Sequence, residues 1–363
     1  MSEPPQALFV SYTAVLGGAE RILLANATAL EGPVAVACPD GALADAARTG
    51  GLEVLPLSEQ RAELRGSSRD RLAAPLRLAA LRAEVRRAVV NTRPRCVIGW
   101  SMRGVLVAAG ALAGMRGAPP LVFCHNDLLP SRGVGTAVRA AASRAQRVVA
   151  LSHAIAEDLD PRGRLAVQVI HPGVDLERFT PTPLPDGPPE ALVLGAIVGW
   201  KSPGLALDAA ELARRDLPGL TVRLAGAPLG EAGQELWRAL EQRVATSGLA
   251  RLDGGIEDVP DAIAGSTCLL HCADHEPFGV ALTEALACGR PVVAPRAAGP
   301  LEIVDESCGA LYEPGSAAAA AEALVHVVRH APDMAGPARE RAERLFDRRI
   351  SVRRFRALVE ELT

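Results

Sequence analysis

Two glutamates flank the start of an expected helix in the segment 271–294. Glu276 ends a loop, Pro277 and Gly279 mark a turn, and Glu284 comes eight residues after Glu276. With Glu276 outside the helix and Glu284 about one turn inside it, both carboxylates can face one ligand. The first N–H groups of a helix lie at the positive end of its dipole and bind phosphate or sugar oxygens. The segment predicts a site for a molecule with hydroxyls and a diphosphate, such as a nucleotide sugar, and a solvated, capped helix start is the alternative.

A single lysine, Lys201, is conspicuous because the other 38 of the 39 basic residues are arginines. It follows an expected strand, and a compact ammonium on a flexible stem can neutralise a departing phosphate. His125 ends another expected strand, where open α/β sheets place ligand contacts. We expect Lys201, Glu276 and His125 to be catalytic. A chance surface lysine and a structural histidine are the alternatives.

Backbone groups complete the expected donor site. The N–H groups of Phe278, Gly279 and Val280 belong to the helix start beside Glu276. Gly17 and Gly18 follow the first expected strand, where glycine lets a backbone approach a diphosphate, although an ordinary strand-to-helix turn looks much the same.

Short apolar runs alternate with segments of helical period along the whole chain, which is typical of βαβ units in parallel sheets. One set of strands is expected at Leu8–Ser11, Val34–Cys38, Cys96–Gly99, Leu121–Cys124, Val148–Leu151 and Val167–Ile170. A second set is expected at Ala191–Val198, Thr221–Ala225, Cys268–His271, Pro291–Ala294 and Gly309–Tyr312. The proline-rich stretch between the sets suits neither helix nor central strand and is expected to be a linker. An apolar stripe predicts a packed last helix, at Val352, Phe355, Leu358, Val359 and Leu362.

Several motifs resemble those of retaining GT-B glycosyltransferases of family 4 (glycosyl transferases group 1). Glu276-x7-Glu284 followed by Ala287-Cys-Gly-Arg-Pro-Val-Val-Ala294 is similar to the family signature. Further similar stretches occur in the family's order at 16–21, 148–159, 169–179, 298–304 and 309–315. The resemblance implies an α/β GT-B fold, in which two Rossmann-like domains with parallel sheets face each other across a cleft.

The resemblance also implies domains and residue roles. It implies an N-terminal acceptor-binding domain over 1–180, a linker at 181–189, a nucleotide-sugar-binding domain over 190–346, and a helix at 347–363 that crosses back to the first domain. Glu276 would bind sugar hydroxyls, Glu284 the ribose, Lys201 the diphosphate, and His125 would lie near the transferred sugar. The anomeric configuration would be retained, with no metal ion and no cofactor apart from the nucleotide sugar as co-substrate.

One residue departs from the family pattern. Many members carry an arginine shortly before the lysine, and the corresponding position is Ala196. The leaving group would lose one of two cations. Either another arginine substitutes, the transfer is slower, or the chain is a sugar-nucleotide-binding subunit that catalyses nothing.

Other patterns exclude competing classes. Cys268, His271, Cys272 and His275 have spacings that a metal could use, but alternate residues of a strand face opposite sides, so we predict no metal site. The motif Gly-x-Gly-x-x-Gly does not follow the first strand, which weakens the hypothesis that the chain is a nicotinamide-dependent oxidoreductase. A net charge of −3 does not indicate the basic surface that binding to nucleic acid phosphates requires.

Composition also bears on location. The seven cysteines are odd in number and mostly lie in apolar runs, which is typical of reduced core residues. Without a leader or a spanning segment in the sequence, we expect a cytoplasmic protein. Residues 61–95 hold ten arginines beside an apolar stripe at Leu78, Leu81, Val85 and Val89. The stripe is expected to face the core, so membrane contact is possible in principle but not favoured.

Taken together, the residues and the resemblance predict a glycosyltransferase that moves a hexosyl or N-acetylhexosaminyl group from a UDP- or GDP-sugar to a small polar acceptor, such as a natural-product or aminocyclitol intermediate. A transferase that acts on a lipid or polysaccharide acceptor is an alternative, as is the non-catalytic subunit.

Overall fold

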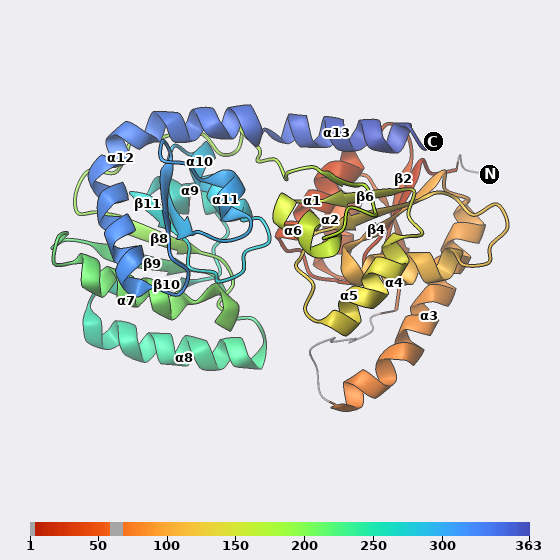
Figure 1. Cartoon of the computed structure of the whole chain (residues 1–363), viewed down its shortest axis with the longest axis horizontal. Coiled ribbons are helices and arrows are strands. Elements are labelled where there is room, and N and C mark those ends of the chain that lie inside the picture. The colour runs from red at the N-terminus through yellow and green to blue at the C-terminus, as the bar shows by residue number, and fades with distance from the viewer. Residues whose placement is uncertain (1–3, 59–67) are drawn as a thin grey trace. The chain divides into compact units, whose positions relative to one another are not determined.

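The computed structural model describes residues 4–58 and 68–363, with the backbone alone over 68–77. The chain divides into two units. The first comprises Met1–Pro172 and Ser351–Thr363, and the second comprises Gly173–Ile350 (Figure 1). The proline-rich segment 181–189 therefore lies within the second unit.

The first unit is built on a seven-stranded parallel sheet in the order β3-β2-β1-β4-β5-β6-β7. Its strands are β1 (Ala7–Val10), β2 (Val34–Cys38), β3 (Glu53–Pro56), β4 (Cys96–Trp100), β5 (Leu121–His125), β6 (Arg147–Ala150) and β7 (Val167–Val169). Its helices are α1 (Gly18–Thr28), α2 (Ala42–Thr49), α3 (Ser68–Thr92), α4 (Ser101–Leu112), α5 (Arg132–Ala142), α6 (His153–Leu159) and most of α13 (Arg348–Glu360).

Helices cover both faces of this sheet. Side chains of α1, α2 and α13 form one apolar core with it, and those of α3 to α6 form the other. Strands buried on both faces must be apolar throughout, which explains the unbroken apolar runs of β1 and β2. The expected stripe of the last helix is confirmed, because Phe355, Leu358 and Val359 are buried.

The apolar stripe of α3 also packs inward. Leu81, Val85 and Val89 are buried in the first unit. Arg82 and Arg86 of the same helix donate hydrogen bonds to carbonyl oxygens of Leu106 and Ala111. This part of the stripe faces the core as expected, whereas residues 61–67 of the arginine-rich segment lie outside the described residues.

The second unit repeats the plan with a six-stranded parallel sheet in the order β10-β9-β8-β11-β12-β13. Its strands are β8 (Glu190–Leu194), β9 (Thr221–Ala225), β10 (Ala250–Gly254), β11 (Cys268–Leu270), β12 (Val292–Pro295) and β13 (Gly309–Tyr312). Its helices are α7 (Pro203–Ala213), α8 (Gly230–Ser247), α9 (Val259–Ala264), α10 (Val280–Ala287), α11 (Pro300–Ile303) and α12 (Ala317–Leu345), with a 3₁₀ turn η1 at Gly199–Lys201.

Three features of the strands differ from the sequence prediction. The edge strands β3 and β10 were not predicted, because each is partly exposed and mixes polar with apolar residues. The strand expected over 191–198 ends at Leu194. Gly195 takes φ +142°, and a Cβ on Gly226 would lie 1.8 Å from the Gly195 oxygen, so the regular strand is interrupted there, and beyond it Ile197 forms only an isolated bridge with Pro228.

The segment 173–189 is held to the second unit by arginines. Arg290, fully buried, donates hydrogen bonds to the carbonyl oxygens of Thr182 and Pro183. Arg339 donates one to the carbonyl of Phe179.

Over the described residues, no helix is both long enough and apolar enough to span a bilayer.

Candidate functional site

The carboxyl ends of β8 and β11 adjoin in the second unit. The two strands are paired in parallel, yet β8 continues to β9 on one side and β11 to β12 on the other. Such a reversal of strand order leaves a crevice at the carboxyl edge, where doubly wound proteins bind ligands. Lys201 follows β8, and Glu276 follows β11.

Lys201 and Glu276 form an ion pair at this edge, between Nζ and Oε2. The Glu276 side chain is 10% exposed and that of Lys201 is 23% exposed. The Lys201 ammonium also lies 4.3 Å from the centre of the Trp200 ring, a cation–π contact. The two residues that the sequence singled out are thus brought together, although 75 positions separate them.

His271 is a third member of this cluster. Its Nε2 lies 3.1 Å from Oε2 of Glu276, although the ring N–H is not aimed along the line between the two atoms. Burial would raise the pKa of Glu276, but His271 and Lys201 together outweigh it and lower that pKa to about 2. Glu276 is therefore a carboxylate at neutral pH.

Sequence reasoning considered His271 only as a metal ligand and did not assign it to this site. The signal was present, because His271 directly follows the apolar strand β11 and Glu276 lies five residues further on. Cys268 and Cys272 instead pack into the apolar core of the second unit. The strand alternation therefore separates them from His271, as expected.

The start of α10 lies next to Glu276. Gly279 is its N-cap at φ +110°, a backbone conformation that favours glycine, and no side chain caps the helix there. Phe278 is buried and its ring meets that of Phe346 edge-on at 6.0 Å. Val280 is the first residue of α10, and Glu284 lies one turn inside with its side chain partly exposed.

A second loop braces this turn. The N–H of Gly299 donates to the carbonyl of Glu276 at 3.0 Å. A Cβ on Gly299 would lie 2.2 Å from the backbone oxygen of Phe278. The backbone of Glu276 and Phe278 is thus held by a contact that only glycine permits.

In the first unit, His125 ends β5 and is completely buried. Among the described residues, neither ring nitrogen of His125 has a hydrogen-bond partner. Burial, together with the positive charge of Arg139, lowers the pKa of His125 to about 3. Its imidazole is neutral at pH 7, and its two nitrogens are buried polar atoms whose hydrogen-bonding capacity is not used within the described residues.

Gly17 and Gly18 begin α1, after the loop that follows β1. The N–H of Gly17 donates to Oε2 of Glu20 at 3.2 Å, and a Cβ on Gly17 would lie 2.9 Å from the same oxygen. A Cβ on Gly18 would meet nothing within 4 Å. The Gly17 amide is therefore engaged by its own helix, as in an ordinary capped strand-to-helix turn.

A polar cluster at the same edge of the first sheet was not predicted. The guanidinium carbon of Arg103, in the first turn of α4, lies 4.4 Å from the centre of the Tyr12 ring. Burial raises the pKa of Tyr12; the charges of Glu20 and Asp127 add to that rise, whereas Arg103 opposes it. Tyr12 follows β1 and Arg103 follows β4, so the cluster forms where the strand order reverses. Spacing along the chain does not reveal it.

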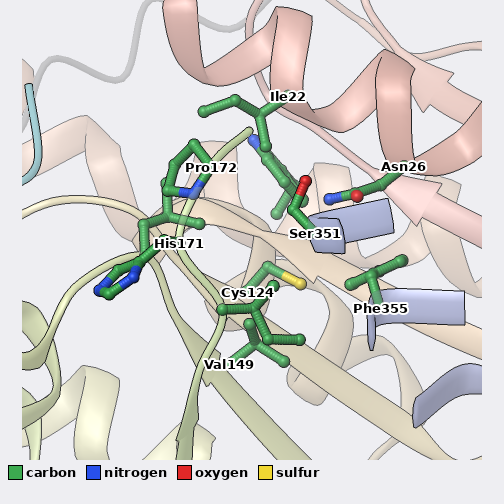
Figure 2. Close-up of a pocket in the computed structure, with 11 residues that line it drawn as sticks. Ile22, Asn26, Cys124, Val149, His171, Pro172, Ser351 and Phe355 are labelled. Carbon is green, nitrogen blue, oxygen red and sulfur yellow. The ribbon is translucent and has the colours of Figure 1, made fainter. Parts of the chain in front are cut away.

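A hollow in the first unit lies apart from His125. It encloses about 280 Å³, part of it open to solvent, and Figure 2 shows Asn26 and Ser351 pointing toward each other within it. Cys124 lines the hollow, whereas His125, the next residue of β5, does not. Its described lining is mostly apolar and includes no arginine or lysine, which does not suit a diphosphate.

The two doubly wound units share their strand order except for the additional edge strand β7 of the first, and the second bears a paired lysine and glutamate at its switch point. This is the architecture of the GT-B class. Two family models match consecutive parts of the chain: "Glycosyltransferase Family 4" over residues 16–178 and "Glycosyl transferases group 1" over 176–343. The chain belongs to glycosyltransferase family 4.

Similar curated proteins include two D-inositol 3-phosphate glycosyltransferases. That of Saccharomonospora viridis is 35% identical over 211 residues, which cover 51% of this chain and 48% of the relative. That of Geodermatophilus obscurus is 31% identical over 257 residues, covering 60% and 56%. The chain thus spans about half the length of these relatives.

Solved structures with the same fold cover nearly the whole chain. The Anabaena protein HepE, solved with UDP-glucose, superposes with a TM-score of 0.79 at 25% identity and covers 98% of each chain. A sucrose-phosphate synthase of Thermosynechococcus elongatus has a TM-score of 0.80 at 18% identity, covering 99% of each. The predicted fold of two parallel-sheet, Rossmann-like domains is confirmed.

Proposed function

We propose that this chain transfers a hexosyl or N-acetylhexosaminyl group from a nucleoside-diphosphate sugar to a small polar acceptor. The observation that carries the proposal is the Lys201–Glu276 pair at the switch point of the second sheet. Family membership supports the same reaction class.

The pair offers one group for each part of the donor. The two side-chain contacts of Glu276 are to Oε2, so Oε1 has no partner among the described residues and can accept a hydrogen bond from a sugar hydroxyl. The ammonium of Lys201 can leave Glu276 for the diphosphate and stabilise the charge that develops there. The uncapped start of α10 adds N–H groups for phosphate oxygens. By resemblance to the family, Glu284 binds the ribose.

A uridine nucleotide is the first donor to test. HepE was solved with UDP-glucose, which supports a UDP-sugar here. We propose UDP-glucose and UDP-N-acetylglucosamine as candidates, with GDP-mannose as the guanosine alternative.

For the acceptor, we propose a polyhydroxylated compound that carries an anionic group. The Arg103 guanidinium is stacked on Tyr12 and donates no hydrogen bond to any described residue, which leaves it available for a phosphate or carboxylate. Glu20 and Asp127, which act on Tyr12, can accept bonds from hydroxyls. The names of the relatives, D-inositol 3-phosphate glycosyltransferases, support a cyclitol phosphate as the first acceptor to try.

We further propose that transfer retains the anomeric configuration and needs no metal ion. A donor phosphate oxygen would take the proton of the acceptor, and His125, neutral and with no hydrogen-bond partner among the described residues, would bind a hydroxyl of the transferred sugar. Activity that survives a chelator, with an α-linked product from an α-linked donor in NMR spectra, is the expected result. Loss of activity that added Mg²⁺ or Mn²⁺ restores would contradict it.

The deciding experiment is a matrix of donors and acceptors. UDP-glucose, UDP-N-acetylglucosamine and GDP-mannose would be incubated with inositol phosphates, aminocyclitols, natural-product aglycones and lipid acceptors, and the products identified by mass spectrometry. A glycosylated soluble polyol supports the proposal, whereas transfer only to a lipid or polysaccharide would overturn the acceptor assignment.

A second candidate is a sugar-nucleotide-binding subunit without catalysis, which Ala196 favours. This residue is exposed just after β8, where many family members carry an arginine. Donor binding in calorimetry without release of nucleoside diphosphate, across all acceptors, would favour this candidate over the transferase.

A further inference from the structure

The carboxylate of Glu276 is held from one side. Both its close side-chain contacts, with Lys201 and with His271, are made by Oε2. His271 is 4% exposed and Glu276 is 8% exposed. A buried carboxylate keeps its orientation only if its partners are themselves fixed.

The two partners differ in how firmly they are placed. The backbone N–H of His271 donates to the carbonyl of Val293 at 2.8 Å, and its own carbonyl accepts a hydrogen bond from the Tyr312 hydroxyl at 2.9 Å. Lys201 instead lies in a 3₁₀ turn on a flexible stem, and its neighbour Trp200 is exposed. When Lys201 moves to a diphosphate, His271 remains as the side chain beside Oε2.

We propose that His271 is a positioning residue for the donor sugar. It holds Oε2 of Glu276, so that Oε1 stays directed at a sugar hydroxyl after Lys201 has moved to the diphosphate. A small rotation of the carboxylate or the ring aligns the N–H with Oε2. This inference rests on the proposed function, and it assigns a role to a residue that neither the sequence motifs nor the comparisons single out.

The chemistry at His271 is specific to a hydrogen-bond donor. A neutral imidazole that donates from Nε2 satisfies Oε2, and the amide of a glutamine reaches a similar position. A leucine fills similar space but leaves a buried carboxylate oxygen without that partner, which is costly. If His271 were only structural, the leucine and glutamine variants would have the same KM for the UDP-sugar.

The test compares His271→Leu, His271→Gln and the control His275→Gln, an exposed position in the same loop. Each variant is assayed for kcat and KM with the UDP-sugar that the wild type uses, and for Kd with UDP alone by calorimetry. We expect His271→Leu to raise KM for the UDP-sugar by about 10- to 100-fold, the range for a hydrogen bond to a charged group. The Kd of UDP should change by less than about twofold, and His271→Gln should restore most of the loss.

The pH profile gives a second readout. In His271→Leu, Lys201 is the remaining partner that lowers the pKa of Glu276, whereas burial still raises it, so this pKa should rise. The acid limb of kcat/KM should therefore move to higher pH. If the leucine variant does not fold, His271→Asn replaces it, because the shorter amide does not reach Oε2.

Three outcomes would overturn the inference. An active wild type whose leucine variant keeps its KM shows that His271 does not act on the sugar. Equal weakening of UDP and UDP-sugar shows a structural role only. A wild type that neither binds nor turns over UDP-glucose, UDP-N-acetylglucosamine or GDP-mannose overturns the proposed function, and this inference with it.

Discussion

At the residue scale, the second unit buries a charge and then compensates for it. Burial disfavours the ionised form of Glu276, while Lys201 and His271 favour it strongly enough to hold its pKa at about 2. This arrangement keeps Glu276 ionised, so its carboxylate can accept hydrogen bonds without changing its protonation state. Its consequences for activity and for stability can be measured separately.

The first prediction concerns the ion pair itself. Glu276→Ala and Lys201→Ala should each lower turnover by about a thousandfold, because one loses the acceptor for the sugar and the other loses the cation for the leaving group. Circular dichroism should show an unchanged fold. Arg243→Ala is the matched control, since it breaks the ion pairs with Asp208 and Glu211 in the same unit and should leave turnover unchanged. Near-normal turnover of either alanine variant would remove that residue from its proposed role.

A second prediction uses the departure at position 196. Ala196→Arg places a guanidinium on an exposed residue just after β8. If the leaving diphosphate lacks a second cation, kcat should rise by about tenfold or less, with little change in Tm. Steady-state kinetics would show this, and an unchanged or lower kcat would mean that another group already supplies the charge.

A third prediction is the pH dependence of stability. The pKa of Glu276 is lowered on folding from its ordinary 4.5 to about 2, so its stabilising contribution is present above about pH 5 and is lost as pH falls toward 2. Thermal unfolding should therefore separate wild type from Glu276→Gln more at pH 7 than at pH 3. A gap in Tm that does not narrow on acidification would contradict the assignment.

At the scale of elements, the site depends on how a loop, a helix start and a second loop are joined. The start of α10 holds Gly279, and the loop before α11 holds Gly299 against the backbone of Phe278. The chemistry of Glu276 therefore depends on residues that would not touch a substrate.

The prediction at this scale is that Gly299→Ala impairs the site. Its Cβ would lie 2.2 Å from the Phe278 oxygen, so the loop that carries Glu276 must shift, with a cost of about 1–3 kcal/mol and at least tenfold in kcat/KM. Gly336→Ala is the control, because it lies in α12 with open space around it and should be neutral or stabilising by up to about 1 kcal/mol. Equal behaviour of the two variants would show that the close approach is not required.

At the scale of the whole molecule, the first unit is completed by the end of the chain. Phe355, Leu358 and Val359 of α13 pack with Phe9 and other side chains of the first sheet, and the rings of Phe355 and Phe9 lie 6.1 Å apart. The second unit, Gly173–Ile350, does not contain these side chains.

Phe355→Ala should therefore destabilise the first unit by about 3–5 kcal/mol and spare the second. Limited proteolysis followed by mass spectrometry should show early cleavage within 4–172 and a resistant fragment near 173–350. Arg354→Ala, at an exposed position of the same helix, should leave the digestion pattern unchanged. Cleavage of both units at equal rates would contradict the division.

Much of the architecture could be predicted from local pattern. Local pattern placed β2, β9 and β13 to the residue. Of these, β2 is an unbroken apolar run, because a strand covered on both faces must be apolar along its length. The loop, turn and helix around Glu276 were equally readable, since Pro277 and Gly279 act on the backbone locally. The edge strands β3 and β10 were not, because one exposed side removes the apolar signal.

The sequence by itself determined the α/β alternation, the helix start at Gly279, and the selection of Lys201 and Glu276 as candidate site residues. Only the tertiary structure decided that these two meet, that His271 shares their carboxylate, and that Arg103 stacks on Tyr12. The reason is physical: the Lys201–Glu276 and Tyr12–Arg103 contacts each join the ends of two strands that become neighbours through the order of the sheet. That order follows from long-range packing, which no local run of residues encodes.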